Sequence, residues 1–110
     1  MRFLAKRAIV AALLLAAAAS HAQTSGQIRG TVVDDDGKAL EGVRVEASAA
    51  SSGSRSAQTG KAGEYRFSLL SPGTYRVTFS RESYSQVEKM ANVRLDGTVT
   101  INAKLFRLSG

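Results

Sequence analysis

Three consecutive aspartates, Asp34, Asp35 and Asp36, form the densest group of potential metal ligands in the sequence. Carboxylate oxygens are hard ligands, so three of them in one turn could contribute to a calcium site. Calcium loops of the EF-hand type, however, place their acidic residues at alternate positions and close with a distant bidentate glutamate. The sequence has neither feature here. We therefore favour an acidic turn before Gly37 and keep calcium at the three aspartates as the alternative.

Three arginines are candidates for a ligand surface. Arg44, Arg66 and Arg76 each lie between apolar residues of an alternating stretch, so we expect them to point away from the core. Together they could bind an acidic polysaccharide, a lipopolysaccharide or another protein. Glu46 and Glu64 lie close by, and mixed charge on outward positions is ordinary for a solvated surface. The solvated surface is the favoured interpretation.

Tyr84 is the aromatic residue that we most expect to be exposed, because it lies in a polar loop of residues 80–85. Its ring could stack on a sugar, since tyrosine combines an apolar body with a polar tip. The alternative is that Tyr84 covers one open end of a small core, and we favour this alternative.

Catalytic chemistry has few residues to draw on. Glu64, Glu82 and Glu88 could supply a carboxylate pair for glycoside hydrolysis, but a domain of this size implies no cleft to hold a substrate. Zinc sites draw on Cys and His, and nucleophilic catalysis on Cys or a His-assisted Ser. The sequence has no Cys, and its one histidine, His21, lies in a segment that we expect to be removed. We predict a protein that is not an enzyme and uses no cofactor.

The N-terminus has the order of a secretory signal peptide. Basic residues at 2, 6 and 7 precede an apolar run of residues 8–19, and a small-x-small site ends at Ala22. The run is shorter than the roughly 20 residues that a membrane-spanning helix needs. We predict cleavage after Ala22, so residues 1–22 are the signal peptide and the mature chain has no transmembrane segment. The alternatives are cleavage after Ala19 and an uncleaved anchor. Three of the 15 basic residues leave with the signal peptide, and the remaining net charge of about +3 argues against nucleic acid as a partner.

The rest of the chain reads as short strands separated by turn residues. Apolar and polar residues alternate in seven stretches, and no segment shows the 3.6-residue period of an amphipathic helix. The stretches are residues 27–33, 43–47, 57–59, 65–69, 75–79, 86–89 followed by 93–95, and 98–106, with a loop at 49–56. Met90 is out of phase with Val93 and Leu95, so we expect a bulge or a change of sheet near residues 89–92. The pattern predicts an all-β chain, as an antiparallel sandwich or small barrel.

Two neighbouring strands supply the core. Tyr65, Phe67 and Leu69 share one strand face, and Tyr75, Val77 and Phe79 share another. Burying such side chains contributes roughly 1.5–3 kcal/mol each. Pro72 and Gly73 lie between the two strands, in a segment that resembles the tyrosine corner of immunoglobulin-like domains. We expect the Tyr75 hydroxyl to bond back to the backbone a few residues upstream.

Taken together, the motifs resemble carboxypeptidase regulatory-like domains over residues 27–106. The first half matches at Ile28, Gly30, Val32, Asp34, Gly37, Leu40, Gly42, Val43 and Val45, and the second half at Thr59, Gly63, Tyr65, Phe67, Leu69, Pro72, Gly73, Tyr75, Val77 and Tyr84. The resemblance implies a transthyretin-like, seven-stranded, Greek-key-like β-sandwich, and the related starch-binding-like superfamily implies carbohydrate as a ligand class. The sequence departs from the family pattern at Gly60, where Asp or Asn is common, and at Ala39, where Pro is common.

These observations predict one domain: signal peptide 1–22, polar leader 23–26, sandwich 27–106 and tail 107–110. The first functional hypothesis is an exported, non-catalytic module that binds carbohydrate or a cell-surface polymer. The second is a structural or interaction domain of the bacterial envelope, as a stand-alone or truncated relative of the N-terminal domain of TonB-dependent receptors. We expect the protein in the periplasm, outside the cell or at the outer membrane, with a glycan or an envelope protein as its partner.

Overall fold

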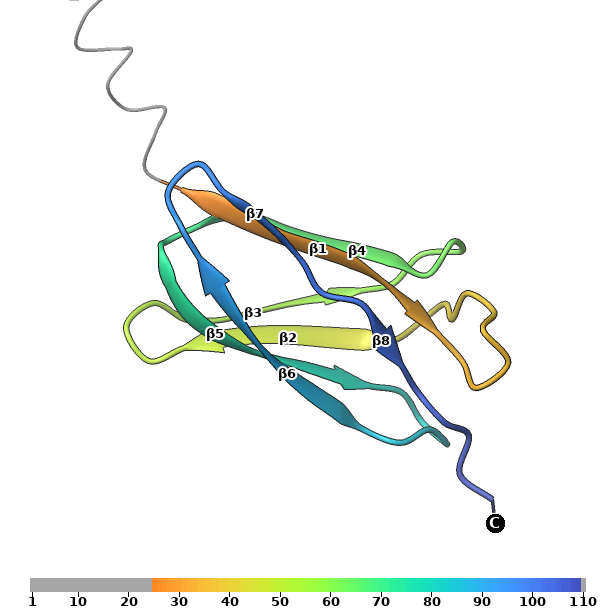
Figure 1. Cartoon of the computed structure of the whole chain (residues 1–110). Coiled ribbons are helices and arrows are strands. Elements are labelled where there is room, and N and C mark those ends of the chain that lie inside the picture. Colours follow the sequence, from red (N-terminus) through yellow and green to blue (C-terminus); the bar gives the residue numbers. More distant parts are fainter. Residues whose placement is uncertain (1–24, 110) are drawn as a thin grey trace, which may run out of the picture.

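Alternating apolar residues build two β-sheets that pack face to face (Figure 1). The computed structural model describes residues 25–109, so the predicted signal peptide, its cleavage site at Ala22 and residues 23–24 of the polar leader lie outside the described residues. The strands are β1 (Gly26–Val33), β2 (Arg44–Ala49), β3 (Gly53–Gln58), β4 (Glu64–Leu70), β5 (Gly73–Ser80), β6 (Val87–Val93), β7 (Thr98–Thr100) and β8 (Ala103–Lys104). The prediction of an all-β sandwich is confirmed. Within residues 25–109, no helix is long and apolar enough to cross a membrane.

One sheet, here called the first sheet, has the order β4-β1-β7, and β8 also pairs with β1. The second sheet has the order β3-β2-β5-β6, and all its pairs are antiparallel. In the first sheet, β7 and β8 run parallel to β1, so the expectation of a purely antiparallel fold is wrong.

The strand count also differs by one from the predicted seven. The segment expected as one strand, residues 98–106, is divided into β7 and β8. Between them residues 101 and 102 continue along the same edge of β1, where the N–H of Ile101 donates to the carbonyl oxygen of Arg29 at 2.8 Å. Apolar alternation continues through this link, which is why the sequence pattern does not show the break.

The core lies between the sheets, on the inward face of every strand except the polar β3. Tyr65 on β4 packs edge-on against Phe67, with ring centroids 6.0 Å apart, and against Phe79 of the second sheet at 5.5 Å. Edge-to-face pairs of this kind add about 0.5–1.5 kcal/mol beyond the area they bury. Tyr65 therefore holds the two sheets together at the centre of the molecule.

Leu69 is a correction to the predicted core. Its side chain is 81% exposed, and Leu70 is buried in its place. The pairing of β4 with β1 shifts between Ile28↔Phe67 and Gly26↔Leu70, so β4 has one residue more than β1 over this stretch. Leu69 takes a left-handed backbone conformation there, with φ of 57°. A β-bulge of this kind reverses the side-chain alternation, and the period-2 pattern ends two residues before the strand does.

The irregularity expected near residues 89–92 is absent. The pairing of β5 with β6 runs without a shift from Gly73↔Val93 to Phe79↔Val87. Met90 is 57% exposed on the outward face of a regular strand. It is out of phase with the buried Val93 because it is an apolar residue on the surface. The loop expected at residues 49–56 is shorter than predicted, because β3 begins at Gly53. Both faces of β3 are mostly exposed, so it lacks the alternation that indicates a strand.

The corner between the sheets agrees with the prediction. The hydroxyl of Tyr75 donates to the carbonyl oxygen of Ser71 at 2.6 Å and lies 3.2 Å from Oγ of Ser52. Tyr75 is otherwise buried. The hydrogen bond to Ser71 fixes the bend through Pro72, where the chain leaves the first sheet for the second.

Candidate site on the outer face of the first sheet

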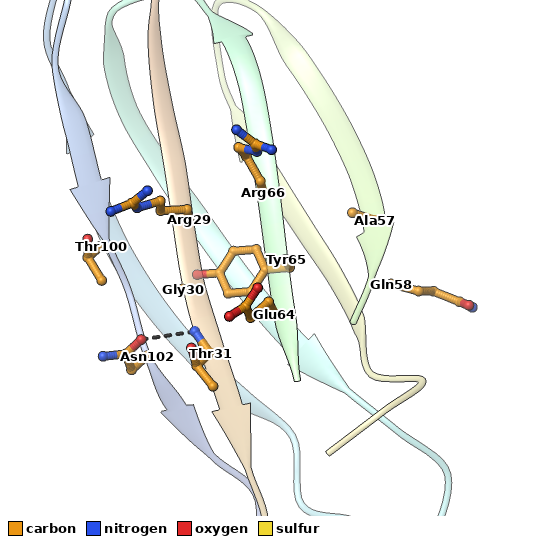
Figure 2. Close-up of a pocket in the computed structure, with 10 residues that line it drawn as sticks. All are labelled: Arg29, Gly30, Thr31, Ala57, Gln58, Glu64, Tyr65, Arg66, Thr100 and Asn102. Carbon is orange, nitrogen blue, oxygen red and sulfur yellow. Dashed lines mark hydrogen bonds between the residues drawn. The ribbon is translucent and has the colours of Figure 1, made fainter. Parts of the chain in front are cut away.

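The outer side of the first sheet carries a shallow hollow of about 750 Å³ (Figure 2). Strands β4, β1 and β7 supply most of its lining, and the end of β3 borders it. The lining residues are Arg29, Gly30, Thr31, Ala57, Gln58, Glu64, Tyr65, Arg66, Thr100 and Asn102. Apart from Tyr65, whose ring is in the core, and the methyl group of Ala57, these residues offer polar side chains or open backbone.

The strand register arranges the outward side chains in two rows. Arg66 on β4 lies opposite Arg29 on β1, and Arg29 lies opposite Thr100 on β7; we call these three residues the arginine row. Glu64 lies opposite Thr31, and Oδ1 of Asn102 accepts the backbone N–H of Thr31 at 2.9 Å; we call these three the glutamate row. The rows are two residues apart along each strand, which is about 7 Å. Guanidinium, carboxylate, hydroxyl and amide groups therefore share one open surface.

The arginine row concentrates positive charge. Within residues 25–109, neither Arg29 nor Arg66 has a carboxylate within ion-pairing distance. Side chains directly opposite each other on antiparallel strands have Cβ atoms about 5 Å apart, and like charges at such positions are destabilising. On the second sheet, Arg44 and Arg76 are each paired with a glutamate: Arg44 lies 3.3 Å from Glu46, and Arg76 lies 3.4 Å from Glu88.

The three arginines chosen from the sequence do not meet on one surface. Arg66 belongs to the first sheet, whereas Arg44 and Arg76 belong to the second and each has an acidic neighbour. Arg29, which lies beside Arg66 in the structure, is not among the residues selected from the sequence. Its position between Ile28 and Gly30 already predicts an outward side chain. The pairing of β1 with β4, which the sequence pattern does not specify, is what makes Arg29 a partner of Arg66.

A glycine in β1 allows this face to form. A Cβ atom on Gly30 would lie 1.8 Å from the carbonyl oxygen of Ile101 and 3.0 Å from the ring of Tyr65. The Tyr65 hydroxyl donates to that same carbonyl oxygen at 2.5 Å. Only a residue without a side chain lets the link between β7 and β8 approach β1 this closely. The close approach places Asn102 beside Thr31 in the glutamate row.

Tyr84 lies at the end of the sandwich where β5 and β6 are connected, away from the hollow. It is half-buried and packs against the core cluster. The guanidinium carbons of Arg81 and Arg107 lie 5.2 and 5.6 Å from its ring centroid, and Nη2 of Arg107 donates to its hydroxyl at 3.0 Å. The ring therefore contacts the core and two of the protein's own cations. These contacts favour the interpretation that Tyr84 covers the open end of the core over the one in which it stacks on a sugar. This contact also ties Arg107, predicted to begin a tail, to the fold.

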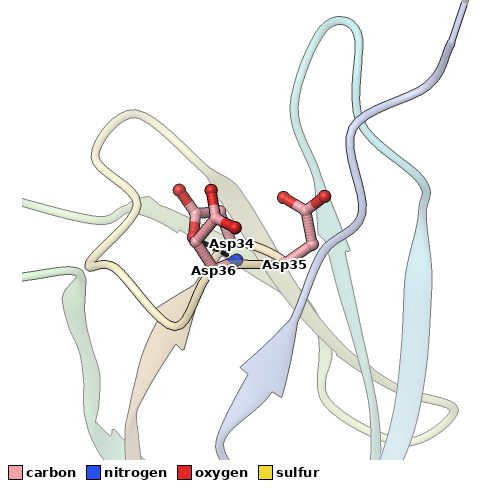
Figure 3. Close-up of side chains that lie close together, drawn as sticks. All are labelled: Asp34, Asp35 and Asp36. Atoms are coloured by element: carbon pink, nitrogen blue, oxygen red, sulfur yellow. Dashed lines mark hydrogen bonds between the residues drawn. The ribbon is translucent and has the colours of Figure 1, made fainter.

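The three aspartates form a turn between β1 and the following segment (Figure 3). Oδ1 of Asp34 accepts the backbone N–H groups of Asp36 at 2.9 Å and Lys38 at 3.0 Å. The hydrogen bond from Lys38, more than any other cause, lowers the pKa of Asp34 below its ordinary value. Asp34 is buried, and Asp35 and Asp36 are exposed; one oxygen from each lies within 4.8 Å of the others. The Asp34 carboxylate thus has a structural role in the turn, as the favoured interpretation requires.

Comparisons with known proteins place residues 27–106 within the match to one family model, described as the carboxypeptidase regulatory-like domain. The TonB-dependent transporter Oar of Myxococcus xanthus is 34% identical over 101 residues, which is 89% of this chain and 9% of that protein. Carboxypeptidase D of Mus musculus is 47% identical over 51 residues, which is 46% of this chain and 4% of that protein. The chain thus spans less than a tenth of either relative.

Among solved structures, a minor pilin of Streptococcus agalactiae aligns with a TM-score of 0.66 and 20% identity, covering 80% of this chain and 47% of the pilin. A proposed carbohydrate-binding protein of Pseudomonas aeruginosa aligns with a TM-score of 0.60 and 13% identity, covering 74% of this chain and 89% of that one. At these identities the likeness concerns the fold.

Proposed function

The chain belongs to the carboxypeptidase regulatory-like domain family, and from this premise we propose that it is an exported, non-catalytic module that binds carbohydrate or a cell-surface polymer. The observation that carries the proposal is the outer face of the first sheet, where the arginine and glutamate rows surround an open hollow. Hydroxyl-rich ligands are recognised by donors and acceptors held on a rigid scaffold. Strands hold these side chains in fixed register.

The absence of a catalytic apparatus in the sequence supports a binding role. The chain has no cysteine, and its single histidine is His21, so neither a Cys–His pair nor a Ser–His pair can form on the sandwich. The solved structure of a proposed carbohydrate-binding protein has a similar fold and is covered over 89% of its length, which makes glycans the first ligand class to test. Export is supported by the basic, apolar and small-residue order of residues 2–22.

A polysaccharide panel tests this function. The purified protein is applied to immobilised neutral and acidic polysaccharides, and its folded state is checked by circular dichroism in the same buffer. We expect retention on at least one class of polymer. Folded protein that is retained by none of them would refute the proposal.

A second candidate function is an interaction domain of the bacterial envelope. The similarity to the TonB-dependent transporter covers 89% of the chain, more than any carboxypeptidase match reported above. The order β3-β2-β5-β6 leaves an edge at β6, and an unpaired edge can accept a strand from a partner. A photo-crosslinker at Asn92, exposed on β6, would capture an envelope protein if this function holds. The same probe at Arg44, exposed on β2, is the control, because both edges of β2 are paired.

A further inference from the structure

We infer that Arg29 and Arg66 together bind the carboxylate group of an acidic, uronate-type polysaccharide, with the glutamate row contacting hydroxyls of the same sugar. This inference deepens the proposed function and rests on it. It names the ligand chemistry and the residues on the first sheet that would recognise it.

The starting point is the uncompensated charge of the arginine row. Two exposed guanidinium groups are held on opposite positions of β1 and β4, without an ion pair to a residue of the described chain. Such a pair is unfavourable in the unliganded protein. A bound anion removes the repulsion and gains charge-assisted hydrogen bonds from two planar donor forks. Charge complementarity therefore selects an anion as the occupant of this row.

The glutamate row restricts the kind of anion. Glu64 lies two residues from Arg66 on the same face of β4, with Thr31 opposite it. A carboxylate accepts hydrogen bonds from sugar hydroxyls but repels a second negative charge, and a phosphate group carries more charge than a carboxylate. A sugar with one carboxylate near the arginines and hydroxyls near Glu64 satisfies both rows. The surface thus favours a carboxylated sugar over a phosphorylated one.

The outward side of the first sheet also lacks a stacking platform. The aromatic residues on β4, Tyr65 and Phe67, are both buried, and none occurs on β1, β7 or β8. Neutral sugars are commonly held by a ring against the sugar face. Recognition on this face must come from charge and hydrogen bonds, which again indicates an acidic polymer.

The test compares polygalacturonate with its fully methyl-esterified form, which keeps the sugar backbone and loses the charge. Binding of the purified protein is measured by isothermal titration calorimetry. We expect affinity for polygalacturonate to exceed that for the ester by about tenfold or more, as for the loss of charge-assisted hydrogen bonds. The affinity should fall as sodium chloride rises from about 0.05 M to about 0.5 M, because the site is exposed.

Variants locate the binding site. Arg29→Gln/Arg66→Gln should weaken polygalacturonate binding by about tenfold or more. The matched control is Arg44→Gln/Arg76→Gln, which removes the same charge from the second sheet and should bind as the unmodified protein does. All four arginines are exposed, so both double variants should fold, and circular dichroism checks this. Arg66→Lys keeps the charge but loses the planar fork, and should show an intermediate loss.

Three results would overturn the inference and leave the proposed function standing. These are equal binding of the esterified polymer, unchanged polygalacturonate binding by Arg29→Gln/Arg66→Gln, and preferential binding of a phosphorylated lipopolysaccharide core over its dephosphorylated form without binding of polygalacturonate. If folded protein binds no polysaccharide of any class, the proposed function and the inference both fail.

Discussion

Thr59 is a buried hydroxyl that joins two segments far apart in the sequence. It is 4% exposed, and its Oγ1 donates to the carbonyl oxygen of Leu40 at 2.6 Å and accepts the N–H of Val43 at 2.9 Å. Its own N–H donates to the carbonyl oxygen of Val43 at 3.0 Å. The turn that leads into β2 is thereby fixed to the end of β3. This explains why a polar residue is retained at this position inside an apolar core.

Thr59→Val should lower the free energy of unfolding by about 2 kcal/mol, because the shape is kept while a buried donor and a buried acceptor lose their partner. Urea denaturation measures the change. Thr74→Val, at an exposed position of β5, is the control and should stay within about 0.5 kcal/mol. Equal effects of the two substitutions would contradict the role assigned to Thr59.

Asp34 makes the stability of the fold depend on pH in the acidic range. Its pKa is lowered in the folded state, first by the hydrogen bond from Lys38, so the carboxylate stabilises the fold above its ordinary value of 3.8. This contribution is lost as the pH falls below that value through the lowered pKa. Asp34→Ala should therefore reduce the melting temperature by a constant amount from pH 7 to about pH 4, and by less below that.

Thermal melts across this pH range check the prediction for Asp34. Asp36→Ala is the matched control, because Asp36 contributes its backbone N–H to the turn, which alanine keeps. A melting-temperature difference for Asp34→Ala that stays the same down to pH 2 would show that the carboxylate charge has no part in it.

At the scale of the elements, the junction of β4 and β5 shows what period-2 reasoning captures and what it misses. Five of the six aromatic and aliphatic residues assigned to the core from alternation are buried, and Tyr75 makes the corner hydrogen bond. The prediction that Leu69 is buried is wrong because a β-bulge changes the backbone conformation at this residue, and the alternation of the preceding residues does not indicate it. Alternation therefore predicts side-chain direction only as far as the strand stays regular.

Tyr75→Phe should cost about 1 kcal/mol, the net value of one hydrogen bond, because the ring stays buried and the Ser71 carbonyl oxygen loses its donor. Chemical denaturation measures the loss. An unchanged unfolding curve would remove the corner bond from the account of how the chain turns between the sheets.

Gly30→Ala tests how closely the link between β7 and β8 lies against β1. The added Cβ would meet the Ile101 carbonyl oxygen, which is backbone and cannot rotate away, so we expect a loss of about 2 kcal/mol or more. Gly60→Ala is the control, because nothing lies within 4 Å of its Cβ position. If Gly30→Ala melts at the same temperature as the unmodified protein, the link does not lie against β1 in solution.

At the scale of the whole molecule, the sequence predicts the sandwich but not the order and pairing of its strands. Inward and outward residues follow from alternation, and turn residues separate the strands. The order of the strands and the parallel pairing of β7 and β8 with β1 arise from contacts about 70 residues apart, as in Gln27↔Thr98. Local pattern carries no information on such pairs. For the same reason Arg66 could be chosen as a candidate, whereas its partnership with Arg29 required the structure.

The central ring of Tyr65 predicts how the whole fold responds to alkali. Burial raises its pKa above the ordinary value of 10.0, so the folded chain keeps a proton that the unfolded chain releases. Its contribution to stability is complete below about pH 10 and is lost as the pH rises toward the raised pKa. Tyr65→Phe should be less stable by about 1 kcal/mol at neutral pH, since the Ile101 carbonyl oxygen loses its donor.

The difference between the unmodified protein and Tyr65→Phe should shrink above pH 10. Urea denaturation at pH 7, 9, 10 and 11 measures it, as an order-of-magnitude comparison of the two chains. A gap that stays constant over this range would mean that Tyr65 ionises as easily in the folded chain as in the unfolded one.

The position of β1 has a consequence for biosynthesis. Of the described strands, β1 is the first to leave the ribosome, yet its hydrogen-bonding partners include Ala103 and Lys104 near the far end of the described chain. Until those residues emerge, one edge of β1 has no partner and its apolar residues face water, which leaves it open to pairing with a neighbouring copy. The domain cannot close until Ala103 and Lys104 have been synthesised, so whatever protects the nascent chain must act on β1 for longest.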